Sequence, residues 1–308
     1  MAKATREAYG IALAKLIEEN EKVVVLDADL TKSTKTADAK KACPERHFNM
    51  GIAEGNMMTT AAGMAASGYT VFASSFSIFA TGSAWEQVRN SIGYPHLNVK
   101  ICGTHAGISV GEDGASHQAL EDIALMRVIP GMSVYQPCDE QETMAIINHV
   151  AKVEGPCYVR LGRGKVEDIY PEGTTFEIGK ISTVNQGSKV AIFATGLMVQ
   201  EAMKAKEELI KEGINPTVVN VSCLKPVDRE GIVGVLKKHD IILTAEEHSV
   251  IGGLGSLVQE IASEEFPIKV TKIGTQDTFG ESGTAQALLE KYGLTAQAIV
   301  EKVRELSK

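Results

Sequence analysis

The stretch NVKICGTHAGISVGEDGASHQALEDIALMRV, residues 98–128, joins three patterns that together decide the fold. Its first seven residues form a short apolar run with β-branched side chains, which is typical of a buried parallel strand. A long loop with three further glycines follows, and LEDIALMRV (120–128) has the pattern of a helix. The stretch therefore predicts one strand–loop–helix unit of a parallel α/β sheet.

The same alternation runs through the rest of the chain. Short apolar runs at 23–28, 69–74, 133–137 and 157–162 predict strands in the first half, and those at 189–196, 217–222, 241–247 and 268–274 predict strands in the second. Between the halves lies a segment richer in Gly, Pro and charge. We expect two doubly wound α/β domains, the first with a mostly parallel sheet. They span residues 1–166 and 188–308, the second being smaller, with a linker at 167–187 that contains one hairpin.

Composition narrows the class of protein. The 308 residues carry a net charge of −8, and no Lys/Arg cluster is long enough to follow a phosphate backbone, so we expect no nucleic-acid partner. Neither a signal peptide nor an apolar run of about 18 residues is present, which predicts a cytoplasmic protein without a membrane partner. The five cysteines are scattered and never spaced as C-x-x-C, which argues against disulfides and a zinc site.

The glycine-rich loop is the first candidate site. It brings His105, Asp113 and His117 within thirteen residues, and long ordered loops of this kind are usually functional. Imidazoles can move protons or hold hydroxyl groups near neutral pH. A flexible loop with a helix N-cap at Ser116 is the alternative interpretation. The two histidines and the aspartate match no standard zinc or iron spacing, so we predict no metal site in this chain.

Two further stretches combine unusual residue types. In NMGIAEGNM (49–57), Glu54 stands among apolar residues, which indicates either a half-exposed helix start or a carboxyl group kept in an apolar site. In FASSFSIF (72–79), Phe72, Phe76 and Phe79 have helical spacing, which predicts either a core stripe or a surface that stacks on a planar ring. The glycines of IGGLGSLV (251–258) favour a tight turn at a helix start over an anion site.

Together these motifs resemble the transketolase family. The run GTHAGISVGEDGASHQALEDIALMRVIPGMSVYQPCDEQE (103–142) is similar to the signature of its pyrimidine-binding domain, and NMGIAEGNM and TAEEHSVIGGLGS (244–256) extend the similarity over essentially the whole chain. The Gly-Asp-Gly and paired-Asn signature of the family's diphosphate-binding domain has no match here.

The resemblance implies the C-terminal subunit of a split transketolase. Such an enzyme uses thiamin diphosphate to transfer a two-carbon ketol unit from a ketose phosphate to an aldose phosphate, as in the pentose phosphate pathway. The cofactor would lie between this chain and a separate N-terminal subunit that binds most of the Mg²⁺. Two copies of each subunit would form a heterotetramer around a homodimer of this chain.

The resemblance also implies roles for residues around the cofactor. Glu54 would hydrogen-bond N1′ of the aminopyrimidine ring and favour its imino tautomer, and an apolar setting would favour the protonated carboxyl that this needs. Phe76 would stack on that ring, with Phe72 and Phe79 as further walls of the pocket. The resemblance gives the second domain no catalytic residue, and we expect that domain to support assembly.

Other matching positions would contact the sugar. His117 would lie near the substrate carbonyl, His105 near its phosphate end, and Asp113 at a hydroxyl group. The terminal phosphate would be bound by Arg6, Ser33 and Arg163, because an arginine fork pairs well with phosphate oxygens. Asp29 matches an acidic position in the same neighbourhood.

Three alternatives remain open at the level of sequence. The β subunit of a 2-oxoacid dehydrogenase shares the glutamate but not the GEDG-x-x-H run, and a deoxyxylulose-phosphate synthase fragment shares both glutamate and arginine features. A non-catalytic homologue would keep only the fold and the partner interface. Fold alone cannot separate these functions.

Overall fold

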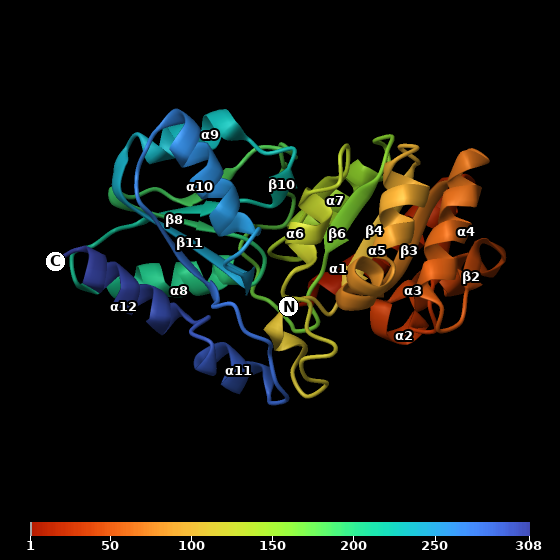
Figure 1. Cartoon of the computed structure of the whole chain (residues 1–308), viewed down its shortest axis with the longest axis horizontal. Helices are drawn as coiled ribbons and strands as arrows, with labels where there is room; N and C mark the ends of the chain where they lie inside the picture. The colour runs from red at the N-terminus through yellow and green to blue at the C-terminus, as the bar shows by residue number, and fades with distance from the viewer. Residues whose placement is uncertain (1) are drawn as a thin grey trace.

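Two α/β domains lie side by side in the computed structural model, which describes residues 2–308 (Figure 1). The N-terminal domain contains a seven-stranded sheet and the C-terminal domain a five-stranded sheet. The predicted architecture of two α/β domains is therefore confirmed.

The larger sheet has the strand order β10-β5-β6-β4-β3-β1-β2 and is parallel except for β10. Its strands are β1 (Val23–Asp27), β2 (His47–Asn49), β3 (Thr70–Phe76), β4 (Val99–Thr104), β5 (Ser133–Tyr135), β6 (Cys157–Arg160) and β10 (Cys223–Lys225). Every residue of β1, β3, β4 and β6 is buried. Burial on both faces explains why these strands read as near-continuous apolar runs.

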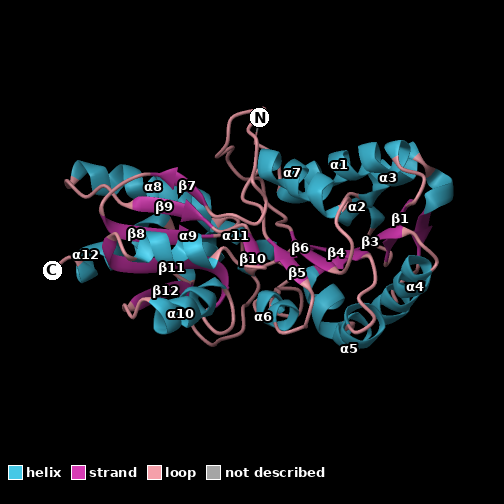
Figure 2. Cartoon of the chain, turned by 90° about the horizontal axis from the view of Figure 1, so that it is seen from above, coloured by secondary structure: helices cyan, strands magenta, loops and turns pink. Residues whose placement is uncertain are grey.

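Helices cover both faces of this sheet (Figure 2). One face carries α1 (Thr5–Glu19), α3 (Thr36–Ala42) and α7 (Glu140–Val150), with the short α2 (Thr31–Thr34) beside them; the other carries α4 (Glu54–Ala66), α5 (Trp85–Gln87) and α6 (Asp122–Arg127). The connection from β3 to β4 is mostly π-helical, in two segments at Phe79–Ser83 and Val88–Gly93 around α5. Asp139 caps α7 by accepting a hydrogen bond from the backbone N–H of Glu142.

The smaller sheet has the order β12-β11-β8-β9-β7. Its strands are β7 (Ser182–Asn185), β8 (Lys189–Ala194), β9 (Thr217–Asn220), β11 (His239–Ser249) and β12 (Val270–Thr275), and its helices are α8 (Met198–Lys211), α9 (Arg229–Leu236), α10 (Leu254–Glu265), α11 (Ala285–Lys291) and α12 (Ala296–Leu306). The buried residues of α8 recur at helical spacing, as expected for a helix that packs one face against the sheet.

Two strands depart from the predicted domain layout. The linker at 167–187 contains no hairpin of its own; instead β7 pairs antiparallel with β9 at the edge of the second sheet. Strand β10 comes from the second half of the chain but pairs antiparallel with β5 of the first sheet. One buried apolar cluster consequently extends from α4 through Leu224 of β10 to α9 and α10.

None of the helices that the structure describes is long and apolar enough to cross a lipid bilayer.

Candidate functional site

Most of the predicted site residues gather at the carboxyl ends of the parallel strands in the first sheet. Glu54 begins α4 after β2, Phe76 ends β3, His105 follows β4 and Arg163 follows β6. In an open parallel sheet ligands bind at the carboxyl ends of the strands, because the strand-to-helix loops converge there.

Glu54 is half-buried as the first residue of α4. The hydroxyl of Ser75, on β3, donates a 2.9 Å hydrogen bond to its Oε1, while Oε2 accepts no hydrogen bond from residues 2–308. The helix N-terminus favours a negative charge at this position. One carboxyl oxygen is thus held in place and the other is free to bind a ligand.

An aromatic cluster at the same end of the sheet is built from Phe76, Phe79, His105 and His117, and Phe76 directly follows Ser75 in β3. The rings of Phe76 and His105 are stacked with centroids 3.9 Å apart, and those of Phe76 and Phe79 are stacked at 6.1 Å. His117 meets Phe79 edge-on at 5.2 Å. Sequence positions 41 residues apart therefore contribute to a single surface of flat rings, which suits a planar heterocycle.

His105 is buried and has a left-handed backbone conformation, with φ of 56°. Its Nδ1 forms a 2.9 Å hydrogen bond with the hydroxyl of Thr104. Burial, followed by the positive charges of Arg6 and Arg163 and the proximity of His117, lowers the pKa of His105 to about 3. The ring is consequently neutral at physiological pH and can hydrogen-bond a hydroxyl group without carrying charge.

The three residues predicted to bind phosphate are also brought together. Arg6 donates from Nη1 to the carbonyl of Ser33 at 2.8 Å and from Nε to the carbonyl of Arg163 at 3.1 Å. Burial lowers the pKa of Arg6; Glu7 opposes this effect and the charge of Arg163 reinforces it. Two neighbouring guanidinium groups create a positive region in which an anion would be stabilised.

Other predicted residues lie at the margin of the site or outside it. Asp113 is exposed, and its carboxylate is 3.9 Å from the guanidinium of Arg163, which also binds Glu112 at 3.2 Å. Asp29 is exposed and forms hydrogen bonds with the side chain of Asn49.

Phe72 does not form a wall of the pocket. It is fully buried within β3, in the apolar cluster beneath α1 and α7 with Tyr9 and Leu13. The helical spacing of the phenylalanines is also misleading, because Phe72 and Phe76 belong to a strand and Phe79 to the π-helical segment after it.

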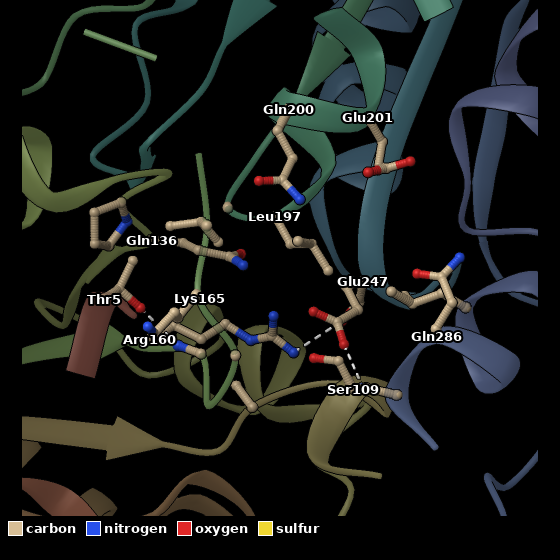
Figure 3. Close-up of a pocket in the computed structure, with 18 of the residues that line it drawn as sticks. Thr5, Ser109, Gln136, Arg160, Lys165, Leu197, Gln200, Glu201, Glu247 and Gln286 are labelled. Carbon is tan, nitrogen blue, oxygen red and sulfur yellow. Dashed lines mark hydrogen bonds between the residues drawn. The ribbon is translucent and has the colours of Figure 1, made fainter. Parts of the chain in front are cut away.

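A separate cavity of about 280 Å³ opens between the two domains (Figure 3). None of the predicted site residues lines it; its polar lining includes Ser109, Gln136, Arg160, Gln200 and Glu247. Arg160 is buried there and forms a two-point ion pair with Asp122, at 2.7 and 3.1 Å. Paired charges of this kind are tolerated in a protein interior because each satisfies the other.

Sequence reasoning missed several residues that shape the site. Ser75 holds Glu54, and Glu247 accepts a 2.6 Å hydrogen bond from the backbone of Ser109 in the glycine-rich loop. The serine-rich run before Phe76 was a usable signal for Ser75. Among the described residues, no group of three or more His, Cys, Asp or Glu side chains is arranged to hold a metal ion.

Comparison with known proteins places the chain in a family. The model of the transketolase pyrimidine-binding domain matches residues 1–168, and that of the transketolase C-terminal domain matches residues 179–299. A Methanocaldococcus jannaschii protein provisionally named as a transketolase C-terminal section is 50% identical over 306 residues, covering 98% of this chain and 96% of the relative. The 6-deoxy-6-sulfo-D-fructose transketolase subunit of a Clostridium species is 39% identical and covers 98% and 94%.

Solved structures agree with this placement. A structure described as a split-gene transketolase in an inactive β4 tetramer has a TM-score of 0.90 and 52% identity, covering 99% of this chain and 98% of that one. The transketolase of Leishmania mexicana has a TM-score of 0.85 and 27% identity, and this chain spans 45% of its length. The chain belongs to the transketolase family.

Proposed function

We propose that this chain is the C-terminal subunit of a thiamin-diphosphate-dependent transketolase. Together with a separate N-terminal subunit, it would move a two-carbon ketol unit from a ketose phosphate to an aldose phosphate. The observation that carries this proposal is that the Ser75-held carboxyl group of Glu54 and the ring cluster of Phe76, Phe79, His105 and His117 both lie at the carboxyl ends of strands of one parallel sheet.

The residues at the carboxyl ends of these strands fit the aminopyrimidine end of the cofactor. A flat heterocycle requires ring surfaces, which Phe76 and Phe79 provide, and a group that hydrogen-bonds a ring nitrogen, which the free Oε2 of Glu54 provides. When bound, thiamin diphosphate supplies the electron sink for breaking the bond between C2 and C3 of the ketose. Glu54 would hold the ring in the tautomer that this chemistry requires.

The two histidines would manage hydroxyl groups and protons of the sugar. His105, neutral because of its burial and the two arginines, is suited to orient a hydroxyl group by a neutral hydrogen bond. His117 is half-buried, and its Nδ1 forms a 3.0 Å hydrogen bond with the hydroxyl of Ser116, which leaves Nε2 for the substrate. We assign His117 the position near the reacting carbonyl.

Arg6 and Arg163 would bind the terminal phosphate, with Ser33 completing the site. Their closeness supports this assignment, because a dianion between two guanidinium groups relieves their mutual repulsion. Asp113, next to Arg163, would accept a hydrogen bond from a hydroxyl group of the donor.

A partner subunit would supply the diphosphate and Mg²⁺ site. Two relatives that this chain covers almost end to end are named as a C-terminal section and as a transketolase subunit, which supports a split enzyme. We propose a heterotetramer with two copies of each subunit. The β4 tetramer described as inactive suggests that the C-terminal subunit alone does not catalyse the reaction.

A ketol-transfer assay tests the proposal. Xylulose 5-phosphate and ribose 5-phosphate would be supplied with thiamin diphosphate and Mg²⁺ to this chain alone, to an N-terminal transketolase subunit from the same genome, and to their mixture. We expect activity only in the mixture, and its loss on replacing Glu54 with Ala. The matched control is Glu18→Ala, an exposed glutamate toward the far end of α1, which should leave the rate unchanged.

Each other outcome would contradict the proposal. Activity of this chain alone would remove the need for a partner. A mixture that lacks ketol-transfer activity but decarboxylates pyruvate and condenses the two-carbon product with glyceraldehyde 3-phosphate would indicate a deoxyxylulose-phosphate synthase. Full activity of Glu54→Ala would exclude this glutamate from the chemistry.

A further inference from the structure

Three hydrogen bonds join the C-terminal domain to the segment 105–120, which carries His105, Asp113 and His117. The carboxyl group of Glu247 accepts a hydrogen bond from the backbone N–H of Ser109 at 2.6 Å. The backbone N–H of Ser249 donates to the carbonyl of Leu120 at 2.8 Å, and Gln118 Nε2 donates to the carbonyl of Glu281 at 3.0 Å. The loop is therefore anchored by a domain that contributes none of the predicted catalytic residues.

Glu247 makes the most intimate of these contacts. Gly107 has φ of 85°, and a β-carbon at that position would overlap with the carboxyl group of Glu247. The glutamate thus packs directly against the bare backbone of the loop, two residues after His105. Figure 3 shows its side chain reaching toward Ser109 at the floor of the interdomain cavity.

Arg160 fixes the other side of this contact. Its Nη2 donates to the carbonyl of Glu247 at 3.0 Å and to the carbonyl of Ala119 at 3.1 Å, while Asp122 balances its charge. The backbone of Glu247 is therefore tied to the far end of the same loop. Backbone and side chain of this one residue together span the segment from Gly107 to Ala119.

Packing alone does not account for the buried carboxyl group of Glu247. Glu247 is 3% exposed, and the hydrogen bonds to its carboxyl group within residues 2–308 come from Ser109. Desolvating a carboxylate is costly, so an apolar side chain would fill the same space at lower cost. An apolar side chain could not accept a hydrogen bond from the Ser109 N–H, and so could not hold the backbone of the loop in a fixed position.

We propose that Glu247 is a positioning residue for ketol transfer, which holds the backbone of residues 105–118 from the C-terminal domain and thereby sets the positions of His105 and His117. The inference rests on the proposed function and extends it. It also assigns a task beyond assembly to the second domain, which sequence reasoning did not foresee.

The neighbouring residue provides a matched control. Glu246 is equally buried in β11, but its carboxyl group accepts from the backbone N–H groups of Leu254 and Gly255 at the start of α10. Replacing either glutamate with Ala removes a buried carboxyl group from the same strand. Only Glu247→Ala removes a contact with the glycine-rich loop at residues 105–118.

Two readouts separate positioning from general stability. In the assembled enzyme we expect Glu247→Ala to lower kcat by about tenfold or more, the equivalent of one hydrogen bond to a charged group, with little change in the KM for ribose 5-phosphate. Amide exchange in residues 105–118 of the isolated chain should become about tenfold faster. Glu246→Ala should lower the melting temperature but change neither readout, and Glu247→Gln, whose amide oxygen can still accept from Ser109, should recover most of the activity.

The inference is overturned if Glu247→Ala and Glu246→Ala have the same kcat and the same loop exchange. If Glu247→Ala does not fold, Glu247→Asp takes its place, because it keeps a carboxyl group that is one methylene too short to reach Ser109; unchanged kcat and unchanged loop exchange would then be fatal. Failure of the proposed function is a separate result, because it would show as a wild-type mixture without ketol-transfer activity, whereas the exchange measurement needs no substrate.

Discussion

Replacing Asp122 with Ala would leave the guanidinium of Arg160 buried without a carboxylate. Asp122 accepts hydrogen bonds from Arg160 Nε at 2.7 Å, from Arg160 Nη2 at 3.1 Å and from the hydroxyl of Tyr158 at 2.5 Å, and all three side chains are almost fully buried. Burial alone would raise the pKa of Asp122, but the charge and hydrogen bonds of Arg160 outweigh it and hold that pKa below its usual range. The carboxylate is therefore ionised and paired in the native protein.

Breaking a buried pair by removing one partner costs about 3–5 kcal/mol, a large share of the roughly 5–15 kcal/mol by which proteins are stable. Unfolding a chain of 308 residues changes entropy by about 0.65 kcal/mol/K, at about 2.1 cal/mol/K per residue. The melting temperature should therefore fall by about 5–8 °C, as measured by circular dichroism or calorimetry.

The control is Asp240→Ala, an exposed aspartate in β11, which should shift the melting temperature by no more than a degree or so. Replacing both members of the pair, as Asp122→Leu with Arg160→Met, should cost less than Asp122→Ala alone because no charge is left unpaired. A melting temperature of Asp122→Ala equal to that of the control would refute the reasoning.

Three other predictions concern the site. Arg163→Ala should raise the KM for a phosphorylated donor by about tenfold, equivalent to one charged hydrogen bond, and leave the KM for the same ketose without its phosphate unchanged; equal effects on both donors would exclude a phosphate contact. Because the folded-state pKa of His105 lies near 3, below its unfolded value of 6.5, the unfolded chain binds more protons between these values. The free energy of unfolding should therefore fall as the pH drops below about 6.5, by about 2 kcal/mol at pH 5. Denaturant titrations at pH 5 and at a pH above 6.5 should show a smaller loss for His105→Asn than for the wild type. Phe76→Ala should weaken thiamin diphosphate binding to the assembled enzyme by about tenfold, whereas Phe72→Ala should cost about 3–5 kcal/mol of stability and spare the affinity of the folded enzyme; the opposite pattern would return Phe72 to the pocket.

The long apolar strands and the amphipathic helices could be predicted from the sequence because burial on two faces, or on one stripe, leaves a periodic pattern. Strands β2 and β10 could not, since HFN and CLK are three residues long and β10 forms only through pairing with a strand some ninety residues earlier. Phe72 was misplaced for a related reason. Its spacing to Phe76 fits both a helix and one face of a strand, and only the tertiary structure separates the two.

Within the site, residue types in local stretches of sequence were predictable and long-range contacts were not. Glu54, His105 and His117 stand in stretches whose composition is unusual for a surface or a core. By contrast, the contact of Glu247 with Ser109 joins residues 138 positions apart, and no local pattern encodes it. Glu246 and Glu247, near the end of β11, could be linked to the site only once the fold was known.

Strand β10 has a consequence for how the chain is made. The edge of β5 that faces β10 has no partner until residues 223–225 leave the ribosome, after much of the second domain has been synthesised. Until then it exposes a row of unpaired backbone groups, which can template pairing between nascent chains. A fragment cut within residues 167–187 would carry the same open edge permanently, so we expect it to aggregate rather than fold as an independent unit. The first sheet is thus completed only by a segment from the second half of the chain, so the folding of one domain depends on the synthesis of the other.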